Sequence, residues 1–292
     1  MNIITTEQNK PDKIQLLRAQ RVAYNQAKRV FTIEIITQVI ALSAPIFFLI
    51  NLSETSHSSV KYLSGGLSII TLILYLVSQS KTHLAVRIQE EFDTSLFGIE
   101  WNKIACGKKV DLAEIKKLAN TYQKSDLFDW YSTEVGKIKE RCMAVLVCQS
   151  INSNWDNTLR KTYIKYLLVF SVLYYTVLLI ILRDLKLMEI VTVMSPTISF
   201  LIFIVLNYRN NLSILRRKQS LQDEITPLFE VYRNKRKQPS KKLIRQIQDA
   251  IFSERKRKEK IPDWFYRIYR GRQEKEMDEY VFDLIYKYTL DK

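Results

Sequence analysis

The sequence has 292 residues and a formal net charge of +15, with 47% apolar residues and only six glycines and six prolines. So few turn-forming residues in a long chain count against a fold of many short strands and favour long helices. The positive charge suits an anionic partner or an anionic membrane surface, and the three cysteines, which show no CxxC spacing, do not indicate a disulfide framework.

From the N-terminus, residues 12–31 are predicted to form a helix that continues into the first of four uncharged segments. A helix of about 20 mostly apolar residues crosses the hydrocarbon core of a bilayer, where only a helix or a closed barrel satisfies its own backbone. One such run can be a buried core helix, but four together predict an all-α integral membrane protein with four transmembrane helices. The segments without Asp, Glu, Lys or Arg are Ile35–Ser53, Tyr62–Ser80, Tyr166–Leu182 and Ile190–Tyr208.

The short loops 54–61 and 183–189 join these spans into two hairpins. Six Lys and Arg residues lie in 1–30, twelve in 81–160 and twenty-two in 209–292, against three in the two loops. Because Lys and Arg stay on the cytoplasmic side, we expect a multi-pass membrane protein with both termini in the cytoplasm. The predicted organisation is a cytoplasmic N-terminal helix (1–30), a first transmembrane hairpin (31–80), a cytoplasmic helical segment (81–160), a second transmembrane hairpin (161–208) and basic cytoplasmic C-terminal helices (209–292), with the cytoplasmic parts forming a helical bundle.

Polar side chains interrupt the predicted spans. Hydroxyl and amide groups of this kind hydrogen-bond between packed helices in lipid, or they line a water-filled path in an oligomer, and both interpretations stay open. Pro196 is expected to kink the fourth span. The candidate pore-lining residues are Thr37, Gln38, Ser64, Ser68, Thr71, Ser195 and Thr197.

Three carboxylates, Glu90, Glu91 and Asp93, follow the second span in the stretch IQEEFDTSLFGIEWN. They lie off the apolar face of a predicted helix, which favours ion pairs with nearby cations, although a partner contact or acid–base chemistry is also possible. A metal site would need histidines or more converging carboxylates, and the chain has only two histidines. We therefore predict no catalytic residue, no metal and no cofactor, and rank a membrane-bound enzyme using these three residues last.

Further along the chain, residues 141–166 are predicted to form one helix that runs into the third span. A helical stalk should follow the fourth span, with Arg216, Arg217 and Lys218 near the membrane surface, where anionic lipid attracts them. Residues 241–260 form an amphipathic pattern and Pro262 marks the start of a last helix.

Aromatic and basic residues alternate at the start of that last helix. Aromatic rings stack on bases and guanidinium groups match phosphates, so an anionic nucleotide is a candidate ligand. The alternative is a helix whose aromatic residues pack on its neighbours while its arginines face water. No DNA- or RNA-binding module is present, so a nucleic-acid polymer is not an expected partner. The candidate ligand-binding residues are Trp101, Trp264, Tyr266, Arg267 and Arg270.

The layout of two hairpins and basic helices, the block QEEFDTSLFGIEWN and the block IPDWFY resemble the SMODS-associating four-transmembrane effectors. This resemblance implies a membrane effector of the bacterial antiphage systems called CBASS, which senses a cyclic oligonucleotide and permeabilises the inner membrane. It implies membrane lipid and a cyclic oligonucleotide as partners, and because four spans rarely enclose a channel alone, a homo-oligomeric pore. The alternative function is a constitutive membrane scaffold or small channel that nucleotides do not gate.

Overall fold

The computed structural model describes residues 3–50, 54–257 and 260–288, and this part of the chain forms helices and no strand. The helices are α1 (Ile4–Glu7), α2 (Pro11–Ile50), α3 (Glu54–Phe97), α4 (Lys103–Cys106), α5 (Leu112–Asn120), η1 (Thr133–Lys137), α6 (Arg141–Asn154), α7 (Asn157–Ile181), α8 (Leu187–Met194), η2 (Ser195–Thr197), α9 (Ile198–Lys235), α10 (Lys241–Lys256) and α11 (Asp263–Tyr288).

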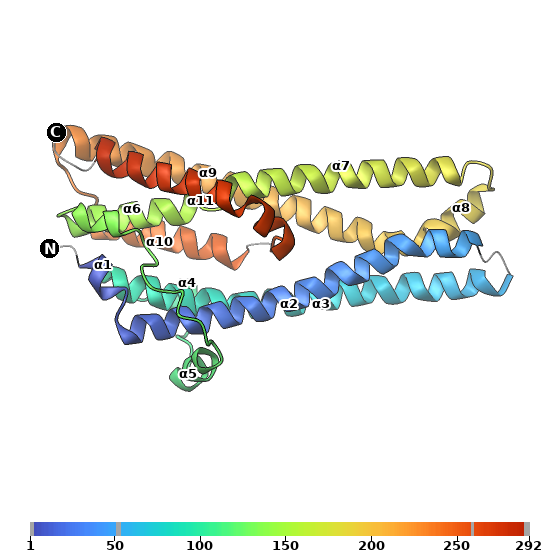
Figure 1. The fold of residues 1–292 in the computed structure, drawn as a ribbon, viewed down its shortest axis with the longest axis horizontal. Coiled ribbons are helices and arrows are strands. Elements are labelled where there is room, and N and C mark those ends of the chain that lie inside the picture. Colours follow the sequence, from blue (N-terminus) through green and yellow to red (C-terminus); the bar gives the residue numbers. More distant parts are fainter. Residues whose placement is uncertain (1–2, 51–53, 258–259, 289–292) are drawn as a thin grey trace.

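The molecule is long and has two unlike ends (Figure 1). At one end, which carries both chain termini, the inner parts of α2, α3 and α9 lie with α6, α10 and α11 in what we call the polar bundle, and α5 packs against α2. At the other end are the membrane helices: the outer parts of α2, α3, α7 and α9, together with α8. Within the described residues, four helical stretches are long and apolar enough to cross a membrane, which confirms the prediction of four spans.

The membrane helices expose apolar side chains. Leu76, Val172 and Val205 are 67%, 65% and 60% exposed. So much exposed apolar surface is unfavourable in water, but it is the ordinary surface of a helix that lipid surrounds. The exposure of these side chains therefore supports the membrane assignment.

Three helices join the membrane part to the polar bundle without a break, and the first of them is α2, whose 40 residues run from the bundle into the first hairpin. The 44 residues of α3 run from the first hairpin into the bundle, and because α3 begins at Glu54, the prediction of a loop over residues 54–61 is wrong. The 38 residues of α9 run from the second hairpin into the bundle. A rigid helix transmits displacement along its length, so these three helices connect the two ends mechanically.

The fourth span is interrupted at Ser195–Thr197, where the 3₁₀ turn η2 separates α8 from α9. Pro196 has no N–H to give to the helix ladder and occupies the start of this turn, so the predicted kink is confirmed. The turn is buried and packs against both α2 and α3. The break thus lies inside the membrane part, at the centre of its helix packing.

The prediction of one helix over residues 141–166 is wrong, because α6 ends at Asn154 and α7 begins at Asn157. Asp156 between them has a φ of +65°, in the left-handed region that Asp tolerates better than most residues. Its carboxylate accepts from Arg160 Nε at 3.1 Å and Lys218 Nζ at 2.9 Å. These two buried cations hold Asp156 at the break.

The predicted contact of Lys218 with anionic lipid is wrong. Its side chain is 1% exposed and bonds to Asp156, so it belongs to the protein interior, whereas Arg216 and Arg217 are exposed. Arg160, 1% exposed, donates through Nη1 to Asn211 Oδ1 at 2.5 Å. A buried ionic cluster therefore ties the start of α7 to α9 just below the membrane helices.

The polar bundle has the larger hydrophobic core. Phe92 of α3, Met143 and Leu146 of α6, Phe229 of α9 and Ile251 of α10 meet in one cluster and are at most 1% exposed. The apolar residues 143–148 of α6 are buried in this bundle. Burial of such side chains contributes about 1.5–3 kcal/mol each, so α3 and α9 are held firmly at the bundle end.

Candidate functional site

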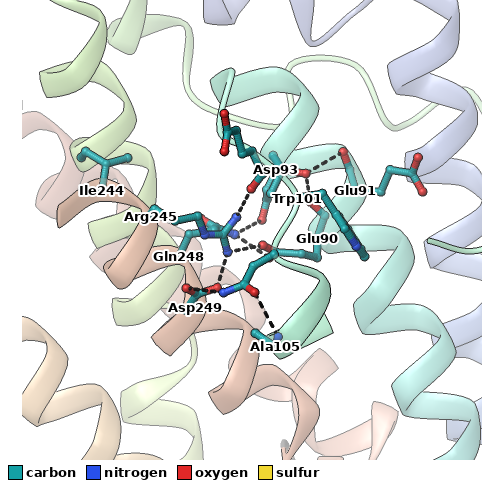
Figure 2. Close-up of polar contacts among 12 residues, drawn as sticks. Glu90, Glu91, Asp93, Trp101, Ala105, Ile244, Arg245, Gln248 and Asp249 are labelled. Atoms are coloured by element: carbon teal, nitrogen blue, oxygen red, sulfur yellow. Dashed lines mark hydrogen bonds and ion pairs between the residues drawn. The ribbon is translucent and has the colours of Figure 1, made fainter. Parts of the chain in front are cut away.

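The carboxylates of α3 turn into the protein and meet α10 (Figure 2). Glu90 and Asp93 are both 0% exposed, although they were expected on a polar outer face. Arg245 Nη2 donates to Glu90 Oε1 at 2.8 Å, and Gln248 Nε2 donates to Glu90 Oε2 at 2.7 Å. Glu91 points away from this group and pairs with Lys109 at 3.2 Å. The expected ion pairs exist, but two of the three carboxylates form them in the core.

Asp93 has two further strong donors. Tyr131 Oη lies 2.7 Å from Asp93 Oδ1, and Arg255 Nη1 lies 2.5 Å from Oδ2. Arg255 is itself 6% exposed, so this is a fully buried ion pair. Asn152 of α6 donates to Tyr131 Oη at 2.7 Å. We call Glu90, Asp93, Tyr131, Arg245, Gln248 and Arg255 the ionic network.

Burial determines the protonation of this network. Loss of water raises the pKa of Glu90 to about 7, even though Gln248 and Arg245 act in the opposite direction. Glu90 lies ten residues beyond Ser80, about 15 Å past the end of the uncharged segment at 1.5 Å per residue. It therefore titrates inside the polar bundle and not in lipid. Burial also raises the pKa of Tyr131 well above its ordinary value.

The donors around Glu90 and Asp93 are arginine, glutamine and tyrosine, which hold a carboxylate in place. An acid–base catalyst needs a carboxyl that reaches a substrate, and here both carboxyls are enclosed by α10. The arrangement is suited to fixing α3 against α10. A change that separated these helices would expose two buried carboxyl groups and break several hydrogen bonds at once.

Trp101 stands close to this network. Its Nε1 donates to the Gly107 carbonyl at 2.8 Å, and Lys109 Nζ lies 5.6 Å from the ring centroid. The indole packs against a small cluster that contains Cys106 and Phe252. Asn102 beside it caps α4 and donates to Asp249 at 3.0 Å. Trp101 thus belongs to the junction of α3, α4 and α10.

The other four candidate ligand residues lie on α11 and contact different neighbours. Trp264 is 57% exposed, and Tyr266 lies under Lys28 at 5.9 Å. Arg267 donates to the Asp263 carbonyl at 3.4 Å, and Arg270 pairs with Glu274 at 2.7 Å. The structure groups these four on one helix and does not bring them together with Trp101, so their role in binding a ligand stays a prediction.

The polar residues of the spans lie between helices within the single chain. Gln38 Nε2 donates to Thr71 Oγ1 at 3.0 Å, which joins α2 to α3. Ser64 Oγ donates to the Ser195 carbonyl at 2.7 Å, which joins α3 to η2. Thr197 is 1% exposed, and its carbonyl accepts from Tyr175 at 3.2 Å.

The remaining hydroxyls of this set bond to their own helix. Thr37 donates to the Ile33 carbonyl at 3.1 Å and Ser68 to the Ser64 carbonyl at 3.0 Å. In the conformation described, the candidate pore-lining residues therefore stabilise helix packing. Whether they line a water-filled path in an oligomer stays a prediction.

Sequence reasoning missed the partners of the network. Gln248, Glu254 and Arg255 are buried on α10 although they are polar or charged. The signal that could have found Arg255 is its spacing: it lies at i+4 from Ile251 and i+8 from Ile247, on the stripe that packs inward.

Four apolar helices attached to a bundle that contains buried ionic contacts define a polytopic helical membrane protein with an attached polar domain. The sequence matches the family described as the SMODS-associating 4TM effector domain over residues 2–284, and the chain belongs to this family. It is also similar to a curated protein described as a probable CBASS effector molecule of Bacillus cereus (strain VD146). The two are 26% identical over 286 residues, which make up 93% of this chain and 94% of the relative. No solved structure matches the chain.

Proposed function

We propose that this protein is an antiphage effector that a cyclic oligonucleotide activates and that then permeabilises the inner membrane. The observation that carries the proposal is that α3 and α9, two of the three unbroken helices, extend from the membrane part into a tightly held polar bundle. The family membership and the description of the Bacillus cereus relative as a probable CBASS effector support the activating signal.

The bundle is proposed to lie in the cytoplasm, because most Lys and Arg residues lie outside the hairpin loops and such residues are retained on that side. The signal is then sensed on the side where the cell would make it. A ligand shifts a conformational equilibrium only by its difference in affinity for the two states. Binding at the end of α10 or α4 would supply this difference, since both helices contact α3.

The pore is proposed to form by rearrangement within a homo-oligomer. In the conformation described, Gln38, Thr71, Ser64 and Thr197 are buried between helices, as expected of a closed state. Moving α3 away from α2 and η2 would release these polar groups and allow them to line a water-filled path. The protein would act by this change of shape and not by catalysis, and its partners would be lipid, the oligonucleotide and further copies of itself.

Release of a trapped dye from liposomes tests the proposal. Purified protein is reconstituted and challenged with cyclic di-AMP, cyclic di-GMP, cyclic GMP-AMP and cyclic tri-AMP, with the linear dinucleotides as controls. We expect one cyclic compound to raise the release rate well above the linear control. Release that is equal with and without every compound would favour the alternative, a constitutive scaffold or small channel.

A further inference from the structure

A cavity of about 710 Å³ lies where the membrane part meets the polar bundle. One wall is formed by Tyr75, Gln79 and His83, which lie on successive turns of α3. The opposite wall is formed by Arg209, Asn210 and Ser213 of α9. The end of α10, which points toward the membrane part in Figure 1, closes the third side. The volume is in the range of about 300–1,000 Å³ that small-molecule sites occupy.

The cavity carries an excess of positive charge. Arg209, Lys256 and Arg257 line it, and none of these three has an ion pair with another residue that the structure describes. Among the described lining residues the one carboxylate is that of Asp249, which pairs with Arg245 Nη2 at 2.6 Å. Three uncompensated cations around one hollow attract an anion.

The side chains of the lining suit a phosphate ester. Arginine offers planar, bidentate donors to phosphate oxygens, and Ser213 and Ser253 add hydroxyl groups. Tyr75 and Phe252 give the same cavity an apolar part, as expected for a ligand that also carries rings or chains. Burial, Lys256 and Lys260 lower the pKa of His83, which keeps its ring neutral and able to donate one hydrogen bond.

We propose that this cavity is a binding site for an anionic phosphodiester, held by Arg209, Lys256 and Arg257. Two sources present this chemistry at a membrane surface: a cyclic oligonucleotide and the headgroup of an anionic phospholipid. The first source rests on the proposed function and would make the cavity the sensor.

The position of the cavity explains how an occupant acts on the spans. Asn210 Nδ2 of α9 donates to Tyr75 Oη of α3 at 3.0 Å, so a hydrogen bond across the cavity wall connects α3 to α9. Phe252 belongs to the cluster against which Trp101 packs, which links the same wall to the α3–α4 junction. A ligand that inserts between α3 and α9 changes their separation at the membrane surface.

The test compares two double variants of the full chain in nanodiscs. Arg209→Gln/Lys256→Gln removes two cations from the cavity, and Arg217→Gln/Lys242→Gln removes two exposed cations from the same helices outside it. Affinity for the four cyclic compounds is measured by calorimetry. Phosphatidylglycerol that remains bound after purification is counted by native mass spectrometry. We expect the cavity variant to lose about tenfold or more in affinity for its phosphodiester, and the control to change by about twofold or less.

The outcomes separate the two sources and the two proposals. Loss of oligonucleotide affinity in the cavity variant alone identifies the cavity as the sensor. Loss of bound phosphatidylglycerol alone, with oligonucleotide affinity intact, assigns the site to lipid. If neither changes, the cavity proposal is overturned, and the proposed function still stands if this variant releases dye on activation. If wild-type liposomes never release dye, the proposed function fails while the lipid measurement still tests the cavity.

Discussion

Asp93 is the residue whose charge the ionic network needs most, because Arg255 is buried and depends on it. Replacing Asp93→Asn leaves that guanidinium without a counter-ion in the core, which costs about 3–5 kcal/mol of unfolding free energy. Glu91→Gln on the same helix removes a partly exposed pair with Lys109 and should cost about 1 kcal/mol or less. Thermal unfolding in detergent compares the two. Equal losses of stability in the two variants would contradict the prediction that the buried Asp93–Arg255 pair contributes more than the Glu91–Lys109 pair.

Glu90 makes stability depend on pH. Its folded pKa of about 7 is above its ordinary value of 4.5, so the folded state binds more protons between these values. The stabilising contribution is therefore complete below pH 4.5 and is lost as the pH rises through 7. Between pH 5 and pH 8 the wild type should lose about 2 kcal/mol more unfolding free energy than Glu90→Gln. Parallel pH profiles of the two proteins would contradict this assignment.

At the scale of elements, the packing of α2 against α3 makes the proposed opening visible to a thiol reagent. Thr71→Cys, in a background with the three native cysteines replaced by alanine, should resist a water-soluble maleimide at rest, because Thr71 is 0% exposed. Activation should make it react if α3 moves away from α2. Leu76→Cys faces lipid and should stay unreactive in both states. Reaction of Thr71→Cys at the same rate with and without activator would exclude this movement.

Element boundaries show what the sequence can and cannot predict. The spans were evident because lipid excludes charge over a whole helix, and Pro196 marked the break in the last one. The break at Asp156 has no Gly or Pro, and depends on Arg160 and on Lys218, 62 positions along the chain. Such a partner is invisible to a local pattern.

The candidate site was harder to predict than the fold for the same reason. Glu90 and Asp93 occupy positions that a helical wheel assigns to solvent, and only their pairing with α10 reverses this assignment. A charged residue is buried when a partner elsewhere in the chain neutralises it. The composition of a single helix does not contain that information.

At the scale of the whole molecule, the proposed orientation places every basic segment on one side of the membrane. A cysteine at Asp184, which is exposed between α7 and α8, should react with an impermeant maleimide in intact spheroplasts. A cysteine at Lys242, exposed on α10, should react only after lysis. Both proteins need the cysteine-free background. The reverse pattern would place the polar bundle outside the cell and exclude an intracellular signal.

The central claim is that a signal received in the polar bundle changes the arrangement of the membrane helices. Spin labels at Leu72 on α3 and Val205 on α9, both exposed on the membrane part, report the separation of these two helices. The distance distribution is measured in liposomes with and without the compound that releases dye. We predict a shift to a different distance on activation only. Dye release accompanied by an unchanged distribution would contradict the account.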